Sequence, residues 1–292
     1  MGFFVLPRNL ERGMLTPVRR EWLARLPDTV YALADRWSLA VGQPYQPGGQ
    51  CSWVAPARDA AGRDLVLKVG WRHGESEHEA EGLRAWQGRG AVELHDAYVT
   101  GSTSALLLER CRPGIPLGDA LPEPAQDEVV AGLLRRLWYE PPAGHPFRSL
   151  AQMCEEWADE FDGKFADDPG ALDLGLARAG MELFRNLPRA PGPHLLLATD
   201  LHAGNVLAAR REPWLMIDPK PYVGDPAYDV LQHLLNCEAR LLVDPRGTAR
   251  RMAGLLDLDA ERVLLWLFAR AVQESPQQPW LRSVAAALAP RT

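Results

Sequence analysis

Two carboxylates and one amide stand at the ends of two short apolar runs near residue 200. In the segment LATDLHAGNVLAARREPWLMIDPK, Asn205 follows Asp200 by five residues, and Asp218 closes the second run. Carboxylate and amide oxygens suit Mg²⁺, which prefers hard oxygen ligands and usually binds together with substrate phosphates. A further carboxylate can orient an attacking hydroxyl and accept its proton. One Asp for the nucleophile, with an Asn and an Asp for the metal, is the layout of a phosphoryl-transfer site.

Each of these residues could instead cap a turn, which is a common role for Asp and Asn. The combined pattern, Asp-x-His-x-x-Asn followed by Ile-Asp, is much less expected by accident. The segment NVLAARREPWLMID predicts a small hairpin, because two apolar runs flank a polar stretch. The surrounding sequence predicts helices, at Glu123–Trp138, Ser149–Phe165, Ala171–Asn186, Tyr228–Ala239, Pro245–Leu256, Asp259–Ser275 and Pro279–Leu288.

The N-terminal part predicts a β-rich unit that contains one charged helix. Residues 38–110 follow the order β-β-β-α-β-β, with a glycine-rich bend at Gly48-Gly49 and a strand at Asp64–Val69. The segment GESEHEAEGLRAWQGRG predicts the helix, because its apolar residues recur at helical spacing and glycines close it.

A helical extension, residues 16–36, precedes this unit. Thr16 before Pro17 has the signature of an N-cap followed by proline at the first helical position. We expect Pro27 to interrupt the helix, since proline inside a helix removes a hydrogen bond. The segment CRPGIPL predicts a hinge, so we expect an α+β protein with an N-terminal domain at 1–111 and a helical C-terminal domain at 112–292.

The segments DLHAGNVL, LMIDP and GDPAYDV resemble the aminoglycoside phosphotransferase branch of the kinase-like superfamily. The resemblance implies a two-lobed protein-kinase-like fold, with a β-rich N-lobe, a mainly helical C-lobe and ATP bound between them. It implies Asp200 as the catalytic base and Asn205 and Asp218 as Mg²⁺ ligands. His202 would be a structural member of the loop, and Asp225 and Asp229 would brace the active-site loops.

The resemblance also implies nucleotide contacts in the N-terminal part. Lys68 would reach the nucleotide phosphates, and Glu79 would pair with it from the charged helix. Glu75, Glu77 and Glu81 are the neighbouring alternatives, and a solvated charged face is the other interpretation of all four. The remaining implied contacts are a loop over the phosphates, formed by Gly48, Gly49 and Ser52, and backbone groups of Glu109 to Cys111 that would bind adenine.

Within that family, the chain most resembles the group of streptomycin 6-phosphotransferases and hydroxyurea phosphotransferases. The resemblance is carried by HEAEGLRAWQGRGAVELHDAY, ALLLERCRPGIPL, TDLHAGNVLAARREPWLMIDPKPYVGDPAYDVLQHLLN and WLFARAVQES. It implies antibiotic resistance by phosphorylation of a small molecule, streptomycin above all. Hydroxyurea or another small metabolite is the alternative substrate.

A guanidinium-bearing substrate such as streptomycin would favour carboxylates, which bind it through paired, charge-assisted hydrogen bonds. Glu156, Asp159 and Glu160 share one face of a predicted helix, and Glu238 and Glu274 are further candidates. The alternative for the helix is a solvated face, and neutral hydroxyurea would need no such patch.

One departure from the family pattern precedes the catalytic motif. The family loop often begins His-Gly-Asp, whereas Ala198-Thr199 precede Asp200 here. A nucleotide-binding regulator with little turnover is therefore an alternative function. A protein kinase is disfavoured, because there is no His-Arg-Asp loop and Pro219-Lys220, rather than Phe-Gly, follow Asp218.

Composition, charge and cysteine content argue against several other classes of protein. The chain has 292 residues, 47% of them hydrophobic and 24% charged, which is ordinary for a globular protein. A net charge of −6 argues against a nucleic-acid partner. The four cysteines form no C-x-x-C pair, and there is no apolar run of transmembrane length, so we expect a cytoplasmic protein with reduced thiols and no membrane partner. His233 and Cys237 have helical i, i+4 spacing, yet core packing is favoured over zinc.

Overall fold

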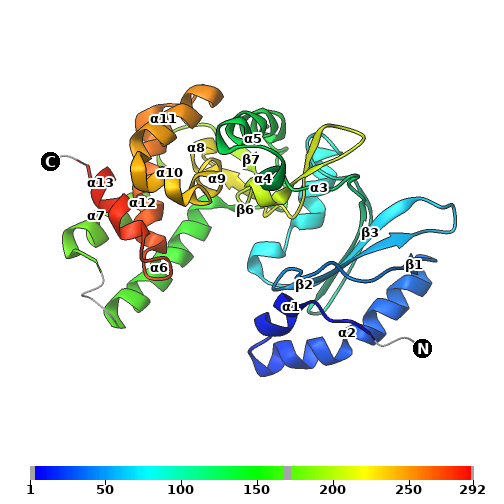
Figure 1. The fold of residues 1–292 in the computed structure, drawn as a ribbon. Helices are drawn as coiled ribbons and strands as arrows, with labels where there is room; N and C mark the ends of the chain where they lie inside the picture. The colour runs from blue at the N-terminus through cyan, green and yellow to red at the C-terminus, as the bar shows by residue number, and fades with distance from the viewer. Residues whose placement is uncertain (1–3, 168–171, 291–292) are drawn as a thin grey trace. The chain divides into compact units, whose positions relative to one another are not determined.

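The computed structural model describes residues 4–167 and 172–290, apart from the side chain of Glu75. The chain divides into two units, Met1–Gly114 and Ile115–Thr292. The first is built around a β-sheet and the second is mainly helical, as the sequence predicts (Figure 1).

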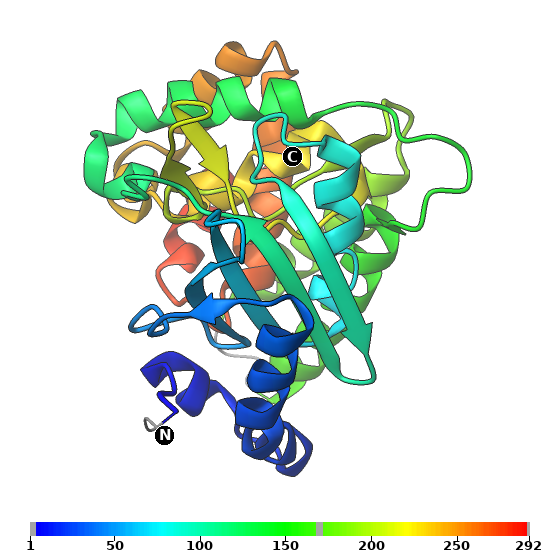
Figure 2. The ribbon, with the colours of Figure 1, turned by 90° about the vertical axis from the view of Figure 1, so that its right-hand side faces the viewer.

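A five-stranded antiparallel sheet forms the centre of the first unit, with the strand order β1-β2-β3-β5-β4. Figure 2 shows the β4–β5 hairpin at the front of this sheet. The strands are β1 (Ala40–Val41), β2 (Ser52–Arg58), β3 (Asp64–Trp71), β4 (Leu94–Thr100) and β5 (Thr103–Glu109).

The two faces of the sheet have different roles because side chains alternate along a strand. Leu65, Leu67 and Val69 of β3 are buried in one core cluster with residues of α1 (Arg8–Gly13) and α2 (Pro17–Arg36). Lys68 lies on the opposite face of β3, toward α3 (Glu79–Trp86), which follows a short 3-10 turn at Gly74–Ser76. The alternation therefore places the apolar core residues of β3 on one face of the sheet and Lys68 on the other.

The predicted break at Pro27 is wrong, because α2 runs without interruption from Pro17 to Arg36. Thr16 does cap it, accepting a hydrogen bond from the backbone N–H of Arg19 at 3.3 Å. Proline inside a helix costs about 3 kcal/mol. Burial of large apolar side chains on both sides of Pro27 offsets that cost, because each contributes roughly 1.5–3 kcal/mol to stability. These side chains are Trp22, Leu26, Val30 and Leu33.

The second unit is organised around α12 (Ala260–Glu274), whose side chains are buried along most of its length. The helices α7 (Leu174–Asn186), α11 (Pro245–Leu256) and α13 (Leu281–Leu288) pack against it (Figure 1). The other helices are α4 (Leu117–Ala120), α5 (Glu123–Leu137), α6 (Leu150–Asp167), α8 (Pro226–Asp229), α9 (Leu231–Leu235) and α10 (Glu238–Val243).

The predicted single helix at Tyr228–Ala239 is wrong, since α8, α9 and α10 replace it. The clearest break is at Asn236, whose side-chain amide donates to the carbonyl of Gln232 at 2.8 Å, and at Cys237, where ψ is 53°. Local side-chain bonds of this kind compete with helical hydrogen bonding. The other predicted helices agree with the structure to within a few residues, and the predicted start at Ala171 lies outside the described residues.

Two small sheets lie among these helices. One has the order β6-β10-β7, formed by β6 (Arg148–Ser149), β10 (Tyr222–Gly224) and β7 (Leu195–Leu197). The other is an antiparallel hairpin of β8 (Val206–Ala208) and β9 (Trp214–Met216), which confirms the predicted hairpin. No helix within the described part of the chain is long and apolar enough to cross a membrane.

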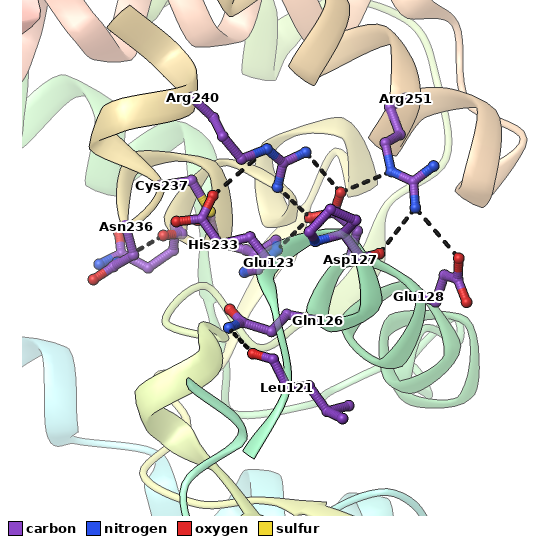
Figure 3. A network of polar contacts seen from close by, with 12 residues as sticks. Leu121, Glu123, Gln126, Asp127, Glu128, His233, Asn236, Cys237, Arg240 and Arg251 are labelled. Carbon is purple, nitrogen blue, oxygen red and sulfur yellow. Dashed lines mark hydrogen bonds and ion pairs between the residues drawn. The ribbon is translucent and has the colours of Figure 1, made fainter. Parts of the chain in front are cut away.

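A buried polar network joins α5 to the segment that holds α9, α10 and α11 (Figure 3). Asp127 is fully buried, and its carboxylate contacts His233 at 2.9 Å, Arg240 at 2.8 Å and Arg251 at 2.9 Å. Cys237 contacts the backbone of His233, so both residues of the i, i+4 pair are part of the packed interior. In the described ranges, no group of three or more His, Cys, Asp or Glu is placed to hold a metal ion.

Candidate active site

Asp200 lies in a tight turn directly after β7. Thr199 has a φ of 50°, and the backbone N–H of Asp200 donates to the carbonyl of Ala198, two residues earlier, at 2.8 Å. This turn directs the Asp200 carboxylate toward Lys220, whose Nζ is 3.2 Å from Oδ2. The Asp200 side chain is 15% exposed, so it is shielded but reachable.

Asp229 fixes the backbone of that turn. Its carboxylate accepts hydrogen bonds from the N–H of Ala198 at 3.0 Å, the N–H of Thr199 at 2.6 Å and the indole of Trp138 at 2.9 Å. Two of these donors are main-chain groups, which every residue except proline supplies. The departure at Ala198-Thr199 therefore leaves these bonds in place, and Thr199 adds one from its hydroxyl to the carbonyl of Lys220.

Burial raises the pKa of Asp229 to about 6, against the opposing effect of its three hydrogen-bond donors. Because this value lies above the 3.8 of an exposed Asp, the folded state holds the proton more tightly than the unfolded chain between about pH 4 and pH 6. The contribution of Asp229 to the free energy of unfolding therefore falls as pH rises through this window, and is constant above it.

Asp229→Asn is expected to remove that pH dependence and to destabilise the fold by about 1–3 kcal/mol, because an amide cannot accept from all three donors. Urea unfolding of both proteins from pH 4 to pH 7 measures the difference. Trp138→Phe is the matched control, since it removes one donor and keeps the titrating carboxylate. Parallel curves for Asp229→Asn and the unchanged chain would contradict the assignment.

Asn205 and Asp218 lie at the same end of the β8–β9 hairpin. Val206 pairs with Met216, and the N–H of Ile217 donates to the carbonyl of Asn205 at 2.9 Å, which places Asp218 one residue beyond. The side-chain Nδ2 of Asn205 donates to the carbonyl of Asp200 at 3.0 Å, so its Oδ1 faces away from that bond. Asp218 is exposed, with a φ of 54°. One amide oxygen and one carboxylate therefore fit a hard divalent cation that keeps water and phosphate ligands.

His202 begins the short turn that leads to Asn205. Its Nδ1 accepts from the N–H of Gly204 at 3.1 Å, and the N–H of Asn205 donates to its carbonyl at 2.9 Å. Burial lowers the pKa of His202, and the carboxylate of Asp200 opposes that shift. The pKa of Asp200 is raised by burial and lowered in turn by Lys220 and His202. These neighbours offset part of the cost of burying the Asp200 charge.

Lys68 and Glu79 form a closed ion pair in the first unit. The Nζ of Lys68 lies 2.7 Å from both carboxylate oxygens of Glu79, and both residues are at least 92% buried. Glu79 is the first residue of α3, where the helix dipole favours a negative charge. Glu79, the residue that the sequence favours as the partner of Lys68, is in contact with it in the structure.

The glycine-rich bend is held by the N-terminal segment. Asn9 donates from its backbone to the carbonyl of Pro47 at 3.0 Å and from its side chain to that of Gly48 at 2.9 Å. Gly48 has a φ of 74°, and a Cβ there would lie 2.5 Å from a side-chain carbon of Pro7, so the position requires glycine. Ser52 begins β2 directly after the bend, and Gly49 has open space around it.

The segment from Glu109 to Cys111, which the resemblance assigns to adenine, begins at the last residue of β5. The N–H of Glu109 donates to the carbonyl of Glu93 at 2.8 Å, and Cys111 is buried. Asp64, at the start of β3, contacts both Arg110 and Arg112, which fixes this segment within the first unit.

The five carboxylates suggested for substrate binding are dispersed over three helices. Those of α6 have basic partners within the chain: Glu156 contacts Arg148, Asp159 contacts Arg185 at 2.9 Å, and Glu160 lies 3.8 Å from Lys164. Glu274, at the end of α12, is 2.6 Å from Arg270, and Glu238 is exposed at the start of α10. A substrate guanidinium would have to compete with these intrachain cations.

Asp225 anchors a different pair of elements. It caps α8 by accepting from the N–H of Ala227 at 3.0 Å, and it accepts from Arg262 and Trp266 of α12 at 2.6 Å each. It therefore holds α8 to α12, while Asp229 at the other end of α8 holds the turn before Asp200.

Lys220 also belongs to the site, although no sequence pattern indicates it. It lies two residues after Asp218, where a lysine in a loop is usually solvated, and the pairing of β10 with β7 brings it to Asp200. The network around Asp127 was missed for the same reason, since its members are separated by more than 100 residues.

The chain is similar to known proteins over most of its length. The family described as "Aminoglycoside/hydroxyurea antibiotic resistance kinase" matches residues 36–279. A hydroxyurea phosphotransferase of Kitasatospora aureofaciens is 37% identical over 260 residues, which are 87% of this chain and 73% of the relative. A streptomycin 6-kinase of Streptomyces glaucescens is 34% identical over 261 residues, which are 87% of this chain and 83% of the relative.

A solved structure shows the fold at lower sequence similarity. An amicoumacin kinase in complex with AMP-PNP, Ca²⁺ and Ami has a TM-score of 0.56 and 13% identity, over 88% of this chain and 87% of that one. The fold is kinase-like, with a β-rich N-lobe and a helical C-lobe, as predicted. The family match and the two sequence relatives show that the chain belongs to the aminoglycoside/hydroxyurea antibiotic resistance kinase family, as a phosphotransferase.

Proposed function

We propose that the chain transfers the γ-phosphoryl group of ATP, with Mg²⁺, to the 6-hydroxyl of streptomycin. The observation that carries this proposal is the arrangement around Asp200, a shielded carboxylate with the amide of Asn205 beside it and Asp218 at the same end of the hairpin. The streptomycin 6-kinase relatives support the substrate, and the family match supports the reaction class.

In the proposed reaction, the substrate hydroxyl oxygen forms a bond to the γ-phosphorus while the bond to the bridging oxygen of ADP breaks. Asp200 orients this hydroxyl and accepts its proton, and the electron pair of the broken bond leaves with ADP. The chain contributes mainly by positioning the reactants and by holding the charged side chains of the site where little water reaches them. The hydrogen bonds of Asp229 to Ala198 and Thr199 keep the base fixed during this step.

Asn205 and Asp218 would hold Mg²⁺, which when bound neutralises charge on the phosphates. Lys68, kept in place by Glu79, is assigned to the phosphates of the nucleotide, with Gly48, Gly49 and Ser52 as the loop over them. The backbone from Glu109 to Cys111 is assigned to adenine. The amicoumacin kinase complex with AMP-PNP and Ca²⁺ supports nucleotide and divalent-metal use in this fold.

Among the acidic residues, we assign Glu156 first to the substrate. It lies on α6, which packs against β6 and β10, and it holds Arg148, whose guanidinium lies over the ring of Tyr222. Tyr222 pairs with Leu197, three residues before Asp200, so these contacts connect Glu156, among the five acidic residues suggested for the substrate, to the catalytic turn. Asp159, Glu160, Glu238 and Glu274 remain further proposals.

Hydroxyurea is the second candidate substrate, favoured by the relative that is 37% identical to the chain. Streptomycin carries guanidinium groups, whereas hydroxyurea is small and neutral, so a substrate panel separates the two. ATP consumption with Mg²⁺ is measured with streptomycin, hydroxyurea and other hydroxyl-bearing compounds. Turnover fastest with streptomycin supports the proposal, and turnover with hydroxyurea alone supports the second candidate. Tight binding of Mg·ATP with no consumption of ATP would overturn both and favour a nucleotide-binding regulator.

A further inference from the structure

Lys220 is fixed by its own backbone to the turn that carries Asp200. Its N–H donates to the carbonyl of Ala198 at 2.9 Å, and its carbonyl accepts from the hydroxyl of Thr199. Two residues later, Tyr222 pairs with Leu197 as β10 runs antiparallel to β7. The backbone that precedes Asp200 and the backbone of Lys220 therefore form one hydrogen-bonded assembly.

The side chain of Lys220 approaches Oδ2 of the Asp200 carboxylate. Its Nζ is 3.2 Å from Oδ2, and the Nδ2 of Asn205 is 3.4 Å from the same atom. Two donors on one oxygen restrict rotation of the carboxylate, because turning it would break both contacts. The carboxylate is thereby held in one orientation.

The ion pair of Lys220 differs from that of Lys68. The Lys68 ammonium lies 2.7 Å from both oxygens of Glu79, and its side chain is 11% exposed. The Lys220 side chain is 32% exposed, and its contact with Asp200 is longer, at 3.2 Å. Lys220 is therefore less enclosed than Lys68.

From this geometry we infer that Lys220 is a positioning residue for phosphoryl transfer, holding Oδ2 of Asp200 so that Oδ1 faces the acceptor hydroxyl. This inference rests on the proposed function. It adds to that function a cation contributed by the segment after Asp218, in a chain whose catalytic loop, TDLHAGN, contains no lysine or arginine.

Lys220→Met tests the inference, with Lys220→Arg as the conservative variant and Lys164→Met as the matched control. Lys164 is an exposed lysine of α6, 3.8 Å from Glu160. Lys220→Met is expected to lower kcat by about 10²-fold, the size found for removal of a preorganised donor. KM for ATP should change by less than about threefold, as for an interaction made in the transition state. Lys220→Arg should recover part of kcat, and Lys164→Met should match the unchanged chain.

A double variant separates positioning from a merely structural role. If Lys220 acts through Asp200, then Lys220→Met combined with Asp200→Asn is expected to be no slower than Asp200→Asn alone, because the two act as a unit. Multiplied losses in the double variant, or a kcat of Lys220→Met within about twofold of the unchanged chain, would overturn the inference and leave the proposed function standing. An unchanged chain that transfers no phosphoryl group to any acceptor would overturn both.

Discussion

Asp200→Asn is expected to lower kcat for phosphoryl transfer by about 10²–10⁴-fold, the contribution of a positioned general base. The substitution keeps the shape of the side chain and one acceptor oxygen, but the amide cannot take the proton of the substrate hydroxyl. KM for ATP should stay nearly unchanged, because the residues assigned to the nucleotide are untouched. Initial rates at saturating ATP and varied acceptor measure the effect.

Asp257→Asn provides the matched control for this prediction. Asp257 lies in the same unit, is exposed and has a φ of 57°, a conformation that Asn also adopts readily. The control should keep the turnover of the unchanged chain. If Asp200→Asn also kept it, Asp200 would not be the base.

Asp127→Asn is expected to destabilise the fold by about 3–5 kcal/mol, the cost of breaking a buried ion pair by removing one partner. Asp127 is fully buried and contacts two arginines and one histidine (Figure 3). The neutral amide would leave the cations of Arg240 and Arg251 without their shared carboxylate. It would also place a donor against groups that already donate.

Glu128→Gln is the control for Asp127→Asn. Glu128 is the next residue, its side chain is 66% exposed, and it lies 3.3 Å from Arg251. Exposed pairs of this kind contribute about 0–1 kcal/mol. Urea unfolding of the two variants therefore compares a buried with an exposed partner of one arginine. Equal free energies of unfolding for the two variants would show that burial of the network contributes little to stability.

The network also has a defined pH dependence. Burial alone would raise the pKa of Asp127, but hydrogen bonds from His233, Arg240 and Arg251 outweigh it and hold the pKa well below the ordinary value. The contribution of the folded-state carboxylate is therefore present above the unfolded pKa of about 3.8 and is lost as pH falls below it. This sign is opposite to that of Asp229, so comparing the two variants across pH separates their effects.

The sequence predicted features that depend on local pattern. Alternation and helical spacing indicated the strands of the first unit, the hairpin between Asn205 and Asp218, and most helices of the second. Local sequence patterns gave wrong helix boundaries where packing or a side-chain hydrogen bond determined the structure. Four buried side chains keep α2 continuous through Pro27, and the polar bond of Asn236 interrupts an otherwise helical run.

Interactions between distant segments could not be predicted from the sequence alone. The partners of the α6 carboxylates include Arg148 and Arg185, whose proximity depends on how β6 and α7 pack beside α6. Lys220 meets Asp200 only because β10 pairs with β7 in one register. Ala198 and Thr199 are also held by a residue distant in the sequence, because Asp229 belongs to α8.

Transfer of labelled phosphate from [γ-³²P]ATP to streptomycin is the most direct test of the central claim. With Mg²⁺ present, we expect the label on the 6-hydroxyl of streptomycin, located by mass spectrometry of the fragmented product, and we expect Asp200→Asn to abolish most of it. Label that stays on ATP or appears only as inorganic phosphate, with streptomycin and hydroxyurea both unmodified, would contradict the account.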